Sequence, residues 1–188
     1  KSAGCLPGAG SAFWRASRMR AIQHMQETEQ LRASWVRFAV AGATGILIGA
    51  VAVFSAIHAM ESLWFLITCL LWWGVLMIDL GLHLGLMVNL ETGEMQRSLG
   101  WPNRLTEIRG FCAVLVAWGA HWATQGSYVA LVLVFGAAAL TDLLDGWLAR
   151  RGHASTRWGR PYDPFMGGIF FSAAALSLPG MASPNTEL

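Results

Sequence analysis

Residues 141–168 read TDLLDGWLARRGHASTRWGRPYDPFMGG, and this stretch says more about the fold of the 188-residue chain than any other. Asp142 and Asp145 are three residues apart, so on a helix they lie on one face. Two carboxylates at this spacing can share a divalent cation. Asp163, arriving from the next helix, can complete the set of oxygen ligands that Mg²⁺ or Ca²⁺ prefers. The stretch therefore predicts two helices that together hold a cation.

The first of these helices is predicted to lie in a membrane. Residues 128–148 form an apolar run long enough to cross a bilayer, and both aspartates lie near its end. Ionisable groups in such a run are costly, which indicates a functional role. Gly146 and Ala149 follow on the same stripe, and a glycine inside a helix costs about 1 kcal/mol relative to alanine. We therefore expect a ligand to approach this small-residue wall closely.

The order and spacing of these residues resemble the signature of the CDP-alcohol phosphatidyltransferase family, D-x2-D-G-x2-A-R-x8-G-x3-D-x3-D. Where the signature ends in a fourth aspartate, this chain has Gly167. The wording around the motif is most similar to that of phosphatidylglycerophosphate synthases. The residues that match the signature are Asp142, Asp145, Gly146, Ala149, Arg150, Gly159 and Asp163.

A second motif, PNRLTEIR at residues 102–109, resembles the PNxLTxxR sequence that begins the first helix in many members of this family. It precedes the aspartate motif by about forty residues, which is where the family's first helix is expected. Asn103 and Thr106 place an amide and a hydroxyl at a helix start, where backbone N–H groups favour phosphate. Helix capping explains Thr106 almost as well.

The resemblance implies a metal-dependent enzyme of phospholipid biosynthesis. Such an enzyme transfers a phosphatidyl group from a CDP-alcohol, such as CDP-diacylglycerol, to an acceptor hydroxyl and releases CMP. The implied cation is Mg²⁺ or Mn²⁺, and its ligands are Asp142, Asp145 and Asp163. The implied nucleotide-binding residues are Gly146, Ala149, Gly159, Asn103 and Thr106. The residues expected to contact phosphate or substrate are Arg150, Arg109 and Arg157, since guanidinium groups pair well with phosphate. Some of the arginines near the motif are expected only to anchor the membrane topology.

The acceptor is expected to be a small alcohol. The motif wording favours glycerol 3-phosphate, with inositol phosphate, serine or another alcohol still open, and no nucleic-acid partner is expected. The fourth aspartate of the family is the usual candidate for the base that deprotonates this acceptor. Gly167 cannot accept a proton, so no catalytic residue is assigned, and the missing base predicts a loss of roughly 10²- to 10⁴-fold. His153 is a nearby alternative base.

Composition predicts an all-α, polytopic transmembrane bundle, because 55% of the residues are hydrophobic and only 13% are charged. All thirteen Lys and Arg residues fall on one side of the predicted topology, which by the positive-inside rule puts the N-terminus and the aspartate site in the cytoplasm. The three cysteines are scattered along the sequence, and we expect them to be free thiols. The five predicted spans are residues 38–60, 63–88, 105–123, 128–148 and 164–178, two accessory spans and the first three of the family's six.

The resemblance divides the chain into three predicted parts. Residues 91–188 form a partial CDP-alcohol phosphatidyltransferase domain, and residues 38–90 form an accessory transmembrane hairpin. Residues 1–37 are a cytoplasmic segment with five arginines. From residue 12 onward this segment either lies on the membrane surface or is a solvated helix next to the membrane. Gly-x-x-x-Gly spacings in the hairpin make a homodimer plausible.

Asp79 and His83 lie four residues apart inside the second predicted span, and therefore on one face. They can form a hydrogen-bonded pair, bind a metal with help from another helix, or line a polar cavity. Two other functions compete with the enzyme. One is a CDP-lipid-binding or scaffold homologue silenced by Gly167, and the other is a transporter with intramembrane acids. A proton path has no need of the Gly and Ala pattern, which argues against the transporter.

Overall fold

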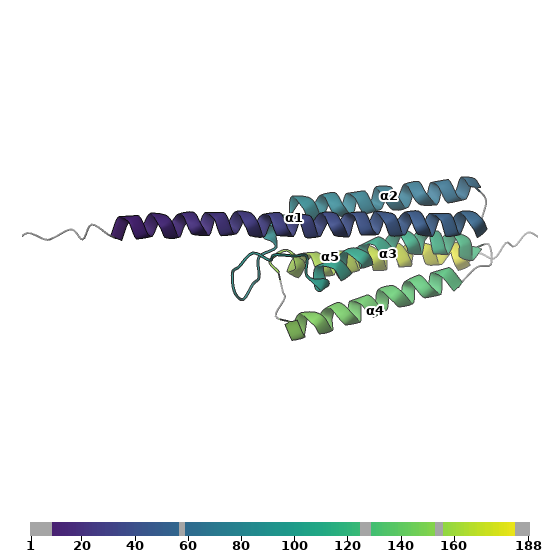
Figure 1. Cartoon of the computed structure of the whole chain (residues 1–188). Coiled ribbons are helices and arrows are strands. Elements are labelled where there is room, and N and C mark those ends of the chain that lie inside the picture. The colour runs from purple at the N-terminus through teal and green to yellow at the C-terminus, as the bar shows by residue number, and fades with distance from the viewer. Residues whose placement is uncertain (1–8, 57–58, 125–128, 153–155, 183–188) are drawn as a thin grey trace, which may run out of the picture.

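The computed structural model describes residues 9–56, 59–124, 129–152 and 156–182 of the chain. The side chains of Asp142 and of residues 145–152 lie outside this description. The helices run up and down side by side, and no strand occurs among the described residues (Figure 1). They are α1 (Ala9–Ala56), α2 (Ala59–Leu82), η1 (Leu84–Leu86), α3 (Trp101–Thr124), α4 (Val129–Gly152) and α5 (Gly159–Ala182). The predicted all-α bundle is confirmed.

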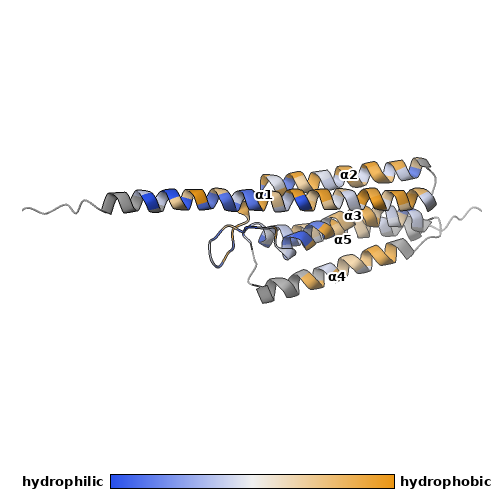
Figure 2. Ribbon diagram, viewed as in Figure 1, coloured by the Kyte–Doolittle hydropathy of each residue, from blue (hydrophilic) through white to orange (hydrophobic). Residues whose placement is uncertain are grey.

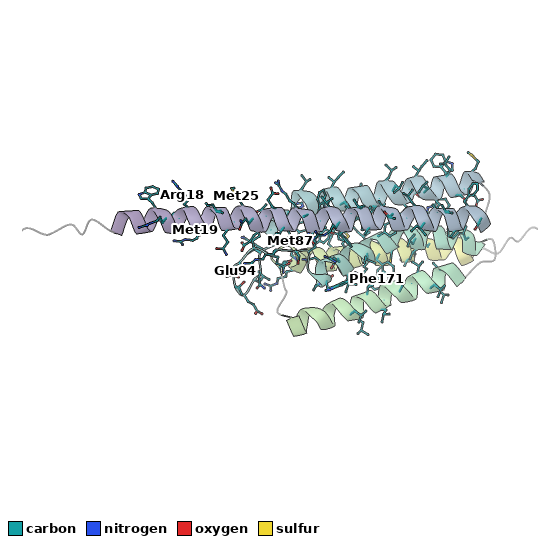
Figure 3. The ribbon with its side chains drawn as sticks, in the orientation of Figure 1. Arg18, Met19, Met25, Met87, Glu94 and Phe171 are labelled. Atoms are coloured by element: carbon teal, nitrogen blue, oxygen red, sulfur yellow. The ribbon has the colours of Figure 1, made fainter. Side chains whose placement is uncertain are left out.

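Two of the described helices are long and apolar enough to cross a membrane, residues 17–55 and 60–82. The first of these stretches belongs to α1, a continuous helix whose polar N-terminal part projects beyond the bundle (Figures 1 and 2). Arg18, Met19 and Met25 extend from this projecting part (Figure 3). A single straight helix cannot lie flat on a membrane while its other half crosses it. The segment is therefore continuous with the spanning part of α1.

Helices α1 and α2 form a hairpin, and they are joined by close contacts of large and small residues. The Trp73 indole lies against Gly42, and its Nε1 donates to the Ala39 carbonyl at 2.9 Å. Trp35 makes a similar contact from the other helix, with its Nε1 donating to the Met77 carbonyl at 3.1 Å. These bonds satisfy indole N–H groups that an apolar environment would otherwise leave unpaired. The hairpin is therefore held by specific contacts as well as by apolar packing.

The segment between α2 and α3 ties the hairpin to the rest of the chain. It contains a short 3₁₀ turn and an isolated bridge between Val88 and Met95, and its side chains Met87 and Leu99 are buried. The Leu99 N–H donates to the buried Ser34 hydroxyl of α1 at 3.1 Å. The loop is therefore packed between α1 and the last three helices, near Met87 and Glu94 in Figure 3.

Helices α4 and α5 both pack against α3, and the contact of α3 with α5 is the more extensive. Small residues permit the close approach of these helices, because Gly110 of α3 faces Met166 of α5 and Gly119 faces Leu131 of α4. Helices α3 and α5 start at the same end of the bundle, where α2 and α4 finish (Figure 1). Both sequence motifs therefore lie at one end.

Several predicted boundaries were wrong. Helix α2 ends at Leu82 rather than residue 88, and a polar histidine and Gly85 follow it. Helix α4 continues to Gly152, and α5 runs from Gly159 to Ala182 rather than over residues 164–178. Pro161 fits the first turn of α5, where an N–H has no intrahelical partner, and Pro179 near the other end costs only one helix bond. The intervening connector is correspondingly shorter than predicted.

Gly42→Ala tests the helix contact in the hairpin. A Cβ added there would lie 2.1 Å from the Trp73 ring, so we expect a loss of about 1 to 3 kcal/mol in the free energy of unfolding. Gly45→Ala is the matched control, because a Cβ at Gly45 meets nothing within 4 Å. This control should be neutral or stabilising by up to about 1 kcal/mol. Thermal unfolding in detergent measures both, and equal effects would contradict the packing argument.

Candidate functional site

The start of α5 is built around a buried threonine. The Thr156 hydroxyl accepts a hydrogen bond from the Gly159 N–H at 2.9 Å, which caps the helix, and donates to Asn103 Oδ1 at 3.3 Å. The Asn103 amide in turn donates to Met87 Sδ at 3.4 Å. A Cβ on Gly159 would lie 2.9 Å from both the Thr156 hydroxyl and Asn103 Oδ1. Glycine is therefore required here by the approach of α3.

One turn further along, the two motifs meet at Asp163. The Thr106 hydroxyl lies 3.0 Å from Asp163 Oδ1, and the Arg109 guanidinium bonds the same oxygen and also donates to the Asp163 backbone carbonyl at 2.8 Å. Arg109 is buried, whereas the Asp163 side chain is 44% exposed. The second carboxylate oxygen receives no hydrogen bond from the described residues. Asp163 is thus held through one oxygen and can offer the other to a ligand.

The alternative that Thr106 caps α3 is wrong. The helix begins at Trp101, and the Arg104 N–H donates to the Gly100 carbonyl at 3.2 Å. Thr106 therefore lies beyond the first turn, where N–H groups already have partners. Its hydroxyl can instead donate to the Pro102 carbonyl at 3.1 Å or to Asp163, one at a time.

The other predicted ligands come from α4. Asp142 and Asp145 lie in its C-terminal half, which finishes at the same end of the bundle as Asp163, although α4 diverges from α5 toward that end (Figure 1). Their side chains, like those of Gly146, Ala149 and Arg150, lie outside the described part of the chain, as does His153. Within the described ranges, no group of three or more His, Cys, Asp or Glu side chains could hold a metal.

The remaining predicted residues are placed as follows. Arg157 has an exposed side chain, and its backbone N–H donates to the Val88 carbonyl at 2.9 Å. Gly167 lies one helical turn after Asp163, and a Cβ there would meet nothing within 4 Å. Cys69 and Cys112 are buried free thiols, as predicted. The position of the missing aspartate is therefore open to a side chain.

Sequence reasoning missed a second polar group on the other side of the contact between α3 and α5. Glu107 is fully buried and accepts a hydrogen bond from the Tyr162 hydroxyl at 3.3 Å. A charged residue four positions after Asn103 must share its helix face, and this spacing was the available signal.

The predicted pair of Asp79 and His83 is confirmed. His83 Nδ1 lies 3.4 Å from Asp79 Oδ1 and 2.8 Å from the Asp79 carbonyl. The His83 ring also stacks on Trp158, with a centroid distance of 4.0 Å and an interplanar angle of 12°. The pair therefore lies between α2 and the start of α5, and not inside an isolated span.

The exchange Asp163→Ala tests the ion pair with Arg109. It removes the carboxylate that faces a buried guanidinium, so we expect a loss of about 3 kcal/mol in the free energy of unfolding. Arg109→Met should cost less, because water can solvate the half-exposed carboxylate that remains. The double variant should recover part of the loss caused by Asp163→Ala. Chemical unfolding in detergent measures all three, and a double variant less stable than Asp163→Ala would contradict the ion pair.

Comparison with known proteins supports the two motifs. Residues 99–186 match the family model of the CDP-alcohol phosphatidyltransferases. The match begins just before α3 and extends past the end of α5, so it contains both motifs and excludes the hairpin. No solved structure matches the chain. We therefore assign residues 99–186 to the CDP-alcohol phosphatidyltransferase family, a family of membrane transferases that act in phospholipid synthesis, as the two motifs predict.

Proposed function

We propose that this protein uses a divalent cation to transfer a phosphatidyl group from a CDP-alcohol, such as CDP-diacylglycerol, to a small alcohol. The observation that carries the proposal is the hydrogen bond between Thr106 and Asp163, residues 57 positions apart. It joins the PNRLTEIR motif to the aspartate motif at the side chain expected to bind the cation. One residue pair from the two motifs, Thr106 and Asp163, therefore supports the proposal.

Each residue has a distinct part in this proposal. Asp142, Asp145 and Asp163 hold Mg²⁺ or Mn²⁺, which neutralises charge on the diphosphate of the donor. Arg109 and Thr106 orient Asp163 through one oxygen and leave the other for the cation. The small residues of α4 leave room for the cytidine nucleotide. Reaction at the phosphorus then breaks its bond to the CMP oxygen and forms a bond to the acceptor oxygen, whose hydroxyl proton is lost to solvent.

The polar end of the bundle is proposed to face the cytoplasm, where CMP leaves and soluble acceptors arrive. The projecting part of α1 continues from this end and carries Arg15, Arg18 and Arg20 on its exposed surface (Figure 2). Such a distribution matches the positive-inside rule. Glycerol 3-phosphate remains the proposed acceptor on the wording of the motif.

A second function deserves the same test, because Gly167 cannot take a proton from the acceptor. A homologue that binds a CDP-lipid without turnover would keep the ion pair at Asp163 and the cation site. The two functions differ in the release of CMP and not in the binding of the donor.

The substitution Gly167→Asp distinguishes the enzyme from the homologue that binds a CDP-lipid without turnover. We expect CMP release from CDP-diacylglycerol and glycerol 3-phosphate to rise by roughly 10²- to 10⁴-fold, because a positioned base contributes that much. Gly168→Asp is the matched control, since a Cβ at either glycine meets nothing within 4 Å but the neighbouring position faces another direction. The control should not raise the rate. Absence of CMP release from the parent and both variants, with donor binding intact, would favour the scaffold.

Removal of the cation gives a further test. EDTA should abolish CMP release and donor binding, and Mg²⁺ or Mn²⁺ should restore both, because the ion neutralises the donor diphosphate. Mn²⁺ binding followed by electron paramagnetic resonance should be lost in Asp142→Asn. Glu94→Gln, an exposed loop carboxylate (Figure 3), controls for the change in charge and should bind Mn²⁺ normally. If Asp142→Asn still binds Mn²⁺, the proposed ligand set is contradicted.

A further inference from the structure

We propose that an anionic phospholipid binds between the hairpin and α3, with its phosphate at Arg104 and an acyl chain in the apolar groove that begins beside this arginine. The groove has a volume of about 340 Å³ and is formed by residues of α1, α2 and α3. Asp163 does not line it, so this site is separate from the proposed transfer chemistry. The residues that define its shape are Phe38, Gly45, Gly49, Trp73, Ile108 and Phe111.

The groove has a fixed aromatic floor and an open wall. Helix α2 packs against both α1 and α3, and its Trp73 ring contacts Phe38 at a centroid distance of 5.4 Å and Phe111 at 5.6 Å. On the α1 side, a Cβ added at Gly45 or Gly49 would meet nothing within 4 Å. The space is therefore already formed, and binding requires no rearrangement of the helices.

The length and chemistry of the groove suit an acyl chain. Residues 38–49 of α1 rise by about 16 Å, which is close to the depth of one leaflet of a hydrocarbon core about 30 Å thick. The stretches of α1 and α2 beside the groove are predominantly apolar (Figure 2). No charged side chain lines it in the described part of the chain, and the Trp73 N–H is already bonded to Ala39. Water would therefore find few partners there.

Arg104 lies at the mouth of the groove, at the polar end of the bundle. It precedes Ile108 by one helical turn, and its guanidinium lies over the Phe38 ring at 5.9 Å from the centroid. One nitrogen, Nη2, donates to the Ser34 hydroxyl at 3.3 Å. Arg104 Nε is buried and has no hydrogen-bond acceptor among the described residues. The side chain is therefore held beside the groove with a donor to spare.

The charge at this mouth is not neutralised by the described side chains. Arg97 and Arg109 each pair with a carboxylate, whereas no described carboxylate pairs with Arg104 or Arg37. Arg37 is exposed and lies four residues before Ala41, which lines the groove. Guanidinium groups suit phosphate, and basic pockets between transmembrane helices bind anionic lipid head groups. A phosphate at the mouth therefore complements the acyl chain in the groove.

The groove lies on the face of α3 that points away from the proposed cation site. Ile108 and Phe111 line the groove, whereas Thr106 and Arg109 bond Asp163. At 100° per residue, the two pairs occupy opposite sides of the helix. The lipid at Arg104 is therefore distinct from the CDP-linked donor.

The experiment measures which phospholipids the full chain retains. The protein is reconstituted in nanodiscs of equal parts phosphatidylglycerol and phosphatidylcholine and extracted into detergent, and the retained lipid is quantified by mass spectrometry. We expect phosphatidylglycerol to be retained in preference. Arg104→Gln should lower its retention about fivefold, and Arg104→Lys should keep most of it. Arg18→Gln removes the same charge from the projecting part of α1 (Figure 3) and should have no effect.

Gly45→Leu tests the groove itself, because the leucine side chain would fill it. We expect this variant to lose the retained phosphatidylglycerol. Gly136→Leu is the matched control, since a Cβ at either glycine meets nothing within 4 Å and Gly136 lines a different groove, formed by α3, α4 and α5. The control should retain the lipid. Equal retention in the two variants would overturn the proposal, as would equal retention of both phospholipids by the parent.

Two other occupants of the groove give different results. If a second copy of the chain fills it, light scattering should show a dimer that Gly45→Leu disrupts, with no lipid retained by the parent. If it belongs to the donor site, excess CDP-diacylglycerol should displace phosphatidylglycerol. Either result would overturn the proposal. Phosphatidylglycerol that stays bound under excess CDP-diacylglycerol would support it, whether or not the chain releases CMP.

Discussion

The docking of α5 on α3 depends on one interaction, the pairing of the buried Arg109 with Asp163. A guanidinium with almost no exposure needs a charged partner, because desolvation of an unpaired charge costs several kcal/mol. Asp163 supplies that partner from α5, and Thr106 adds a hydroxyl to the same carboxylate oxygen. These bonds set the depth and rotation of α5 against α3. The glycine at position 159 then allows the two helices to approach at their starts.

The same interaction links stability to the proposed chemistry. An aspartate held through one oxygen has lost rotational freedom before a cation arrives, which lowers the entropy cost of binding. The arginine therefore acts on Asp163 in the structure, although the sequence suggested a contact with phosphate. The match to the family covers this pair but not the hairpin. The stacking of His83 on Trp158 nevertheless shows that the end of the hairpin packs against the start of α5.

Helical character, the two motifs and the pairing of Asp79 with His83 could be predicted because each depends on residues close in sequence. Boundaries were harder to predict. Helix α5 extends in both directions past its apolar core, since contacts with α3 and the loop before α3 stabilise a polar first turn. Helix α2 is shorter than its apolar run suggested. At α5, contacts with neighbouring segments outweighed local hydropathy.

The sequence by itself determined an all-α membrane protein with a CDP-alcohol phosphatidyltransferase motif and a glycine in place of its last aspartate. It could also place Thr106 and Arg109, three residues apart, on one face of a helix. Only the tertiary structure decided that Thr106 meets Asp163 while Glu107 meets Tyr162. The physical reason is that spacing specifies neighbours within a helix, whereas partners between helices depend on relative rotation and depth. Close packing and the pairing of buried charge set those two quantities.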